Sequence, residues 1–193
     1  PATYAADDEA QTLEVFCYDP HSGLDITLMY SVFPKFDVIT RSVRLKNTGT
    51  DSINIRRVLS ACVEFETCDY DMITLNGSWA RERIIERAPL HHGKQSVDSV
   101  KGESSHQNNP FAALVSHNAD EDSGEAFGFN LVYSGNFFAQ AEVTQHKHTR
   151  FVMGINHFDF NWLLESGAEF TAPEVVMVHS DNGIGGLSRT YHD

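Results

Sequence analysis

The sequence predicts an all-β fold, an antiparallel sandwich of two large stacked sheets. Three observations predict it: apolar and polar residues alternate in many short runs, turn-forming residues separate these runs, and no long run combines helical periodicity with capping residues. A sheet with one apolar face must cover that face, and in a sandwich a second sheet does so. The length of 193 residues suits one domain, which we expect to cover residues 1–193.

The clearest alternation lies in the first third of the chain. Leu24 to Tyr30 has apolar residues at every second position, and Val38–Lys46 repeats this pattern. Both runs are expected to be half-buried strands. In the second run, the side chains expected inside are Ile39, Val43 and Leu45, and those expected in water are Thr40, Ser42, Arg44 and Lys46. Turn residues follow at Asn47, so Ile53–Phe65 is expected to pair back as a hairpin.

Later runs are rich in β-branched and aromatic residues, which favour strands. Strands are expected at Arg83–Ile85, Phe111–Ser116, Ala126–Tyr133, Phe137–Val143, Arg150–Ile155 and Val175–His179. The acidic stretch Asn118–Glu125 is expected to connect two strands of a hairpin. Leu90–Asn109 shows no clear period and is expected to be a long loop, the kind of segment in which function concentrates.

Composition excludes several classes of protein. The chain has 27 acidic and 14 basic residues, so its net charge of -13 argues against a nucleic-acid binder. No apolar run approaches the roughly 20 residues of a membrane-spanning helix. Three cysteines, Cys17, Cys62 and Cys68, are too few for a disulfide framework, which favours the reducing cytoplasm. We expect Cys62 and Cys68 to fill the core as small apolar residues.

No motif for metal or cofactor chemistry is complete. His146 and His148 offer two imidazoles from one strand, but a zinc site needs three or four ligands, so we expect no metal. The phosphate-binding glycine motifs and the nucleophile elbow of serine hydrolases are both missing, so we expect no nucleotide cofactor. Acidic residues are plentiful, but sequence cannot show the separation of two carboxylates that glycoside hydrolysis requires.

The two tryptophans differ in their surroundings. Trp79 follows Asn76-Gly77, a dipeptide typical of tight turns, and such a turn would present the indole at the end of a sheet, where it could stack on a sugar ring. The alternative is that Trp79 is buried, as most tryptophans largely are. Trp162 lies among apolar neighbours and is expected in the core.

Four segments resemble one family in the same order along the chain. They are Leu75–Glu82 (LNGSWARE), Ser104–Phe111 (SSHQNNPF), Leu131–Phe137 (LVYSGNF) and Phe158–Glu165 (FDFNWLLE). Together they resemble the N-terminal domain of glycoside hydrolase family 36 α-galactosidases, bacterial enzymes that hydrolyse raffinose and melibiose. The resemblance covers nearly the whole chain.

The resemblance implies a β-supersandwich that precedes a catalytic (β/α)8 barrel in a retaining enzyme that removes terminal α-1,6-linked galactose. Both catalytic aspartates would lie on the barrel, downstream of Asp193, so no residue of this chain is expected to be catalytic. The family's domain begins upstream of Pro1, which implies a sandwich truncated at its N-terminal side and a sugar-contacting aspartate outside this chain. Ser188–Asp193 resembles the start of the connection to the barrel.

One site residue carries over by resemblance: Trp79, whose counterpart in the family lines the galactose pocket. The expected partners are a galactose-containing oligosaccharide, the protein's own catalytic barrel and, because family members are often tetramers, further copies of the chain. Two other interpretations stay open. The chain could be a free-standing galactoside-binding module, or a mutarotase-like sandwich enzyme with a His and a Glu in one cleft.

Overall fold

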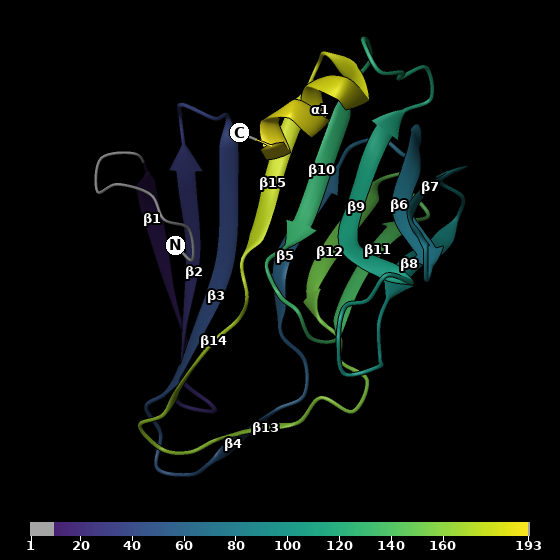
Figure 1. Ribbon diagram of the computed structural model, residues 1–193. Coiled ribbons are helices and arrows are strands. Elements are labelled where there is room, and N and C mark those ends of the chain that lie inside the picture. The colour runs from purple at the N-terminus through teal and green to yellow at the C-terminus, as the bar shows by residue number, and fades with distance from the viewer. Residues whose placement is uncertain (1–9, 193) are drawn as a thin grey trace.

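The computed structural model describes residues 10–192, and its largest sheet has nine antiparallel strands (Figure 1). The strand order is β1-β2-β3-β15-β10-β9-β6-β7, and β14 pairs with the end of β3 beyond β15. The strands are β1 (Gln11–Asp19), β2 (Leu24–Phe33), β3 (Val38–Asn47), β6 (Tyr70–Ser78), β7 (Arg81–Pro89), β9 (Asn108–Ser116), β10 (Ala126–Leu131), β14 (Glu169–Thr171) and β15 (Val175–Ser180).

Smaller sheets cover one face of the large sheet. A three-stranded sheet has the order β11-β12-β5, and a two-stranded sheet pairs β13 with β4. Their strands are β4 (Ile53–Ile55), β5 (Leu59–Phe65), β11 (Phe137–Val143), β12 (Thr149–Ile155) and β13 (Trp162–Leu164). β8 (Gly93–Asp98) runs beside β11. The predicted all-β antiparallel sandwich is confirmed, with sheets of unequal size.

The main core lies between the large and the three-stranded sheet. Phe129 of β10 stacks on Phe151 of β12, with ring centroids 4.0 Å apart. In β9, Ala112 and Leu114 face this core, whereas Ala113 and Val115 belong to a second cluster on the opposite face. β9 is therefore buried on both faces, as expected for a strand with helix and sheet on either side.

The opposite face is covered by a helix that the sequence did not predict, α1 (Gly183–His192). Three glycines lower its helix propensity, so its stability comes from packing. Leu187 is buried against the sheet, and the Tyr191 hydroxyl donates to the carbonyl oxygen of Val176 at 3.0 Å. Burial raises the pKa of Tyr191. A Cβ at Gly128 would lie 2.7 Å from the Tyr191 ring, so glycine allows the close approach.

The predicted faces of β3 are partly wrong. Val43 and Leu45 are buried as expected, but Ile39 is 41% exposed, and Thr40 and Ser42 are buried. Ser42 can be buried because its hydroxyl group is paired. It donates to the carbonyl oxygen of Ala172, between β14 and β15, at 2.7 Å.

The predicted hairpin partner of β3 is also wrong. Ile53–Phe65 does not pair with β3 but divides into β4, which pairs with β13, and β5, which pairs with β12. The chain thus leaves the large sheet after β3. Period two identifies the buried face of a strand and carries no information about which strand lies next to it.

Other local predictions have mixed outcomes. The acidic stretch Asn118–Glu125 connects β9 and β10, as expected. Leu90–Asn109 is not a continuous loop, since it contains β8. Cys62 is exposed and Cys68 half-buried, so the prediction that both fill the core is wrong. Cys62 points outward because its β5 neighbour Ala61 points into the core. Among residues 10–192, no helix has the length and apolar character needed to cross a membrane.

Candidate functional site

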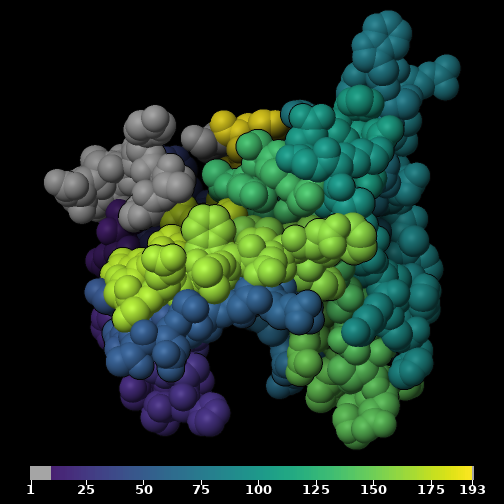
Figure 2. Space-filling model, turned by 90° about the horizontal axis from the view of Figure 1, so that it is seen from below, coloured from purple at the N-terminus to yellow at the C-terminus, as the bar shows by residue number. Residues whose placement is uncertain are grey.

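Trp79 lies at the end of the hairpin formed by β6 and β7, and 84% of its surface is exposed. Ser78 pairs with Arg81, so the connection consists of Trp79 and Ala80. The prediction of a turn at Asn76-Gly77 is wrong, because β6 continues through both residues. The consequence expected for Trp79 nevertheless holds, since the indole is presented at the end of a sheet. The β6–β7 hairpin projects at the upper right of Figure 2.

The backbone at the tip has an unusual conformation. Ala80 and Arg83 have positive φ angles of 61° and 58°, in the left-handed region that few non-glycine residues adopt. The register between β6 and β7 shifts between Asn76 and Ser78, because Glu82 and Arg83 of β7 together lie opposite Gly77 in a β-bulge. The Glu82 carboxylate accepts a hydrogen bond from the Ala80 amide at 2.8 Å. Such features occur where a side chain is aimed in a particular direction.

Hydrogen bonds join three of the four family-like segments to one another. The Gly77 amide donates to the carbonyl oxygen of Gln107 at 3.0 Å, and the Ser104 amide donates to that of Ser134 at 2.8 Å. The Asn156 amide donates to the carbonyl oxygen of Asn136 at 3.0 Å, and Asn156 leads into the fourth segment. The segment that carries Trp79 is therefore hydrogen-bonded to Ser104–Phe111, which is in turn bonded to Leu131–Phe137.

Trp162 is half-exposed, at 47%, so the prediction that it lies in the core is wrong. It is the first residue of β13, and its ring lies 5.2 Å from that of Phe170. Phe158 and Leu163 are also exposed. The segment containing them crosses the lower face of the molecule, in lime green in Figure 2. Apolar neighbours in sequence did not imply burial, because β13 pairs only with β4 at the edge of the fold.

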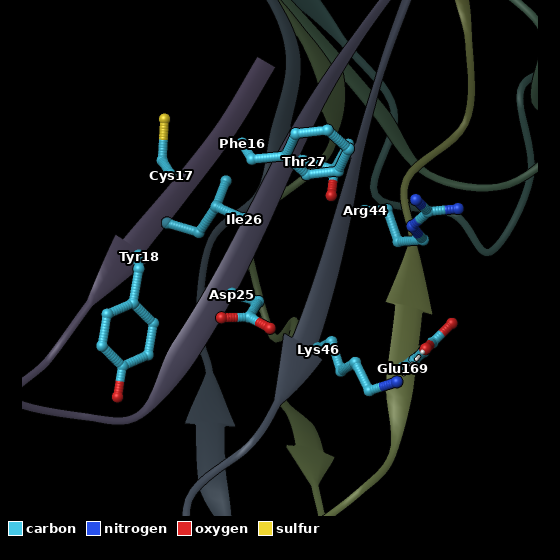
Figure 3. A pocket seen from close by; sticks show the side chains of 9 residues that line it. All are labelled: Phe16, Cys17, Tyr18, Asp25, Ile26, Thr27, Arg44, Lys46 and Glu169. Carbon is cyan, nitrogen blue, oxygen red and sulfur yellow. Dashed lines mark ion pairs between the residues drawn. The ribbon is translucent and has the colours of Figure 1, made fainter. Parts of the chain in front are cut away.

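One hollow lies on β1, β2, β3 and β14 (Figure 3). This is the edge of the large sheet opposite to the β6–β7 hairpin. Its volume is about 490 Å³. Lys46 and Glu169 point toward each other and form an ion pair of 2.9 Å, while Phe16 and Tyr18 are exposed on β1. The Lys46 ammonium lowers the pKa of Glu169. The charges of Lys46 and Glu169 thus satisfy each other.

A second hollow of about 560 Å³ lies between α1 and the start of β7. Leu75, Ile85 and Phe111 make much of its wall apolar, and Arg83 also lines it. Trp79 lines neither hollow. Neither hollow therefore provides a sugar pocket at Trp79.

A charged cluster lies at the other end of the same hairpin. Arg87 Nε contacts the Asp71 carboxylate at 2.7 Å, and His117 Nδ1 contacts its other oxygen at 2.7 Å. Arg87 also donates to the carbonyl oxygens of Ser116, His117 and Ala119. Burial tends to raise the pKa of Asp71, but the hydrogen bonds from Arg87 and His117 outweigh it and lower this pKa. The cluster fastens β6 and β7 to the β9–β10 connection.

Two groups contain atoms that metals bind. His146 and His148 lie in the exposed turn between β11 and β12, not on one strand, with ring centroids 6.4 Å apart. Glu125, His179 and Asp181, which sequence reasoning missed, bring one ligand atom each within 4.8 Å of one another. They are brought together by the pairing of β10 with β15. All three are at least partly exposed, and His179 already contacts both carboxylates.

Sequence comparison identifies relatives over the whole chain. Residues 1–165 match the family model described as "Glycosyl hydrolase family 36 N-terminal domain". The α-galactosidase AgaA of Geobacillus stearothermophilus is 54% identical over 100% of this chain and 27% of its own length. The bifunctional α-galactosidase/sucrose kinase AgaSK of Mediterraneibacter gnavus is 42% identical over 100% of this chain and 21% of its own. The chain thus spans about a quarter of the length of these relatives.

Solved structures agree with this fold. A variant of AgaA in complex with 1-deoxygalactonojirimycin matches with a TM-score of 0.97, covering 100% of this chain and 27% of that one. AgaA variants were also solved in complex with stachyose and with raffinose. The α-galactosidase of Lactobacillus brevis, 41% identical, matches with a TM-score of 0.93 over 95% of this chain and 25% of its own.

Proposed function

This chain belongs to the glycosyl hydrolase family 36 N-terminal domains, and from that premise we propose that it is the N-terminal β-sandwich of a retaining α-galactosidase that hydrolyses terminal α-galactosides such as raffinose. In this proposal a catalytic barrel elsewhere in the protein supplies the nucleophile and the acid/base carboxylate. The chain supplies one wall of the sugar pocket. Relatives such as AgaA are α-galactosidases of about four times its length, which supports a catalytic domain separate from this sandwich.

The exposure of Trp79 is the observation that carries the proposal. An indole that is 84% exposed leaves a large apolar surface in water, which is unfavourable unless a ligand or partner covers it. A rigid aromatic face suits the C–H face of a galactose ring, since stacking there needs no charge and little conformational ordering. The AgaA complexes with raffinose, stachyose and 1-deoxygalactonojirimycin support a galactosyl ligand for this family.

Trp79→Ala in the full-length enzyme tests this role. We expect kcat/KM for raffinose to fall by about 10-fold or more, which corresponds to the loss of roughly 1.4 kcal/mol of transition-state binding. Trp79→Phe should recover part of the loss because it keeps an aromatic face. Initial rates over a range of raffinose concentrations give the measurement.

Trp162→Ala is the matched control, because it removes the other indole of the chain. It should change kcat/KM less than twofold once folding is verified by circular dichroism. The isolated chain, which lacks the proposed catalytic carboxylates, should release no nitrophenol from p-nitrophenyl α-galactoside. A Trp79→Ala enzyme with unchanged kcat/KM would overturn the proposed role of Trp79.

Oligomer assembly is a second proposed role. β1 is an edge strand, and it exposes Leu13, Phe16 and Tyr18. Edge strands with apolar side chains favour pairing with further polypeptide. Light scattering of the full-length protein beside the isolated chain tests this part of the proposal, and a monomeric full-length protein would contradict it.

A further inference from the structure

We propose that Gly77, together with the segment Ser104–Gln107, is the positioning element that fixes where the Trp79 indole stands. This inference rests on the proposed function, because it assigns residues that act on the sugar through Trp79. Gly77 precedes Trp79 by two residues on β6, so a displacement of its backbone passes directly to the hairpin tip.

Gly77 is required by close packing, not by its backbone angles. A Cβ at this position would lie 2.3 Å from the carbonyl oxygen of Arg81, 2.9 Å from Cα of Glu82 and 3.0 Å from the carbonyl oxygen of His106. All three are backbone atoms, so a rotamer change cannot relieve the collision. They come from both neighbours of the strand, namely β7 and the segment before β9. Glycine is the one residue that lets both approach.

The close packing of Gly77 between its two neighbours holds the β-bulge between β6 and β7 in place. The Gly77 amide donates to the carbonyl oxygen of Gln107 at 3.0 Å. The register of β6 with β7 shifts at Gly77, and its register with β9 shifts just before, between Thr74 and Asn76. One residue earlier, the Asn76 side chain donates to Glu86 on β7 at 2.8 Å. The end of β6 is thus fixed from both sides just before Trp79.

The segment Ser104–Gln107 is itself anchored to the sandwich. The Ser104 amide donates to the carbonyl oxygen of Ser134 at 2.8 Å, and the Gln107 amide donates to the Ser105 hydroxyl at 3.2 Å. The Asn109 side chain donates to the carbonyl oxygen of Leu75 at 3.2 Å. These bonds connect the Trp79 hairpin to the strand ends near β10 and β11, which gives the exposed indole a rigid base.

A double-mutant cycle in the full-length enzyme tests the inference. Gly77→Ala should lower kcat/KM for raffinose by about 10-fold or more, because a misplacement of about 1 Å in a binding group is costly. In the Trp79→Ala background the same substitution should change kcat/KM less than about twofold, since residues that act through one another are not additive. Ser105→Ala is a milder variant at the surface and should show a smaller loss that also disappears with Trp79→Ala.

Gly154→Ala controls for general destabilisation. Its Cβ would lie 2.8 Å from the backbone of Leu59 and Ser60 in the three-stranded sheet, a comparable collision far from the hairpin in sequence and in a different sheet. Labelling with 5-fluorotryptophan gives a readout independent of activity. The ¹⁹F resonance that Trp79→Phe removes should shift in Gly77→Ala and keep its position in Gly154→Ala.

The outcomes separate the two proposals. A Gly77→Ala loss that persists in the Trp79→Ala background, or an unchanged Trp79 resonance, would overturn the positioning role while Trp79 keeps its proposed function. If Trp79→Ala alone leaves kcat/KM unchanged, the proposed function of Trp79 fails, and a shifted ¹⁹F resonance would still support Gly77 as the residue that places the indole.

Discussion

At the scale of single residues, the buried side chain of Asn156 hydrogen-bonds groups that lie at and beyond strand ends. The Asn156 side-chain amide donates to the carbonyl oxygens of Ser99 and Phe137 and to the Asp98 carboxylate, and its oxygen accepts from the Phe158 amide. One side chain thus joins the end of β12 to the start of β11 and to the segment that follows β8. Buried polar groups must be paired in this way, because an unpaired one loses its solvation without compensation.

Asn156→Leu should therefore lower the free energy of unfolding by about 2–4 kcal/mol, because it removes the hydrogen bonds to the Ser99 carbonyl oxygen, the Asp98 carboxylate and the Phe158 amide. Asn161→Leu, at an exposed position five residues later, should change it by no more than about 0.5 kcal/mol. Urea denaturation followed by circular dichroism measures both. Equal stability of the two variants would show that these hydrogen bonds do not hold the segments together.

At the scale of elements, the β6–β7 hairpin is fastened at both ends, by Gly77 near its tip and by Asp71 and Arg87 near its base. The pKa of Asp71 is lowered in the folded state. A carboxylate of this kind stabilises the fold at pH values above its unfolded-state pKa of about 3.9, and the stabilisation disappears as the pH falls through its lower folded-state pKa. The hairpin base should therefore loosen in acid.

Asp71→Asn should lower the melting temperature at pH 7 and reduce the loss of stability as the pH falls below about 4. Asp122→Asn, which removes an exposed carboxylate, is the control for the loss of one negative charge. A smaller slope remains in Asp71→Asn because hydrogen bonds from hydroxyl, amide and ammonium donors also lower the pKa values of Asp19, Asp120 and Glu169, respectively. Calorimetry across this range tests the prediction, which an Asp71→Asn profile parallel to the wild type would contradict.

At the scale of the whole molecule, the sequence predicts where most strands lie but not their neighbours. Alternation identified β2 and β3, because burial on a pleated strand has period two, and β-branched and aromatic residues identified β9 to β12. Nothing local determines that β3 pairs with β15, since that contact follows from how the whole chain is packed. α1 escaped prediction for a related reason: Gly183, Gly185 and Gly186 disfavour a helix that the sheet then stabilises through Leu187.

At the candidate site too, the sequence indicates local features but not contacts between distant residues. The turn signal at Asn76-Gly77 lies close to the true turn at Trp79-Ala80, but the sequence left open whether Trp79 is exposed or buried. The contact between Gly77 and Gln107 joins residues 30 positions apart, so no local pattern reveals it. Trp162 was misjudged because its neighbours in sequence are apolar, whereas its neighbours in space leave it half-exposed.

The most direct measurement is a crystal structure of the full-length protein with 1-deoxygalactonojirimycin bound. We predict carbon atoms of the Trp79 indole within about 4 Å of the ligand's C–H face, with the hairpin backbone in the conformation described above. A ligand bound elsewhere, with the indole of Trp79 in open solvent or covered by protein alone, would contradict the account.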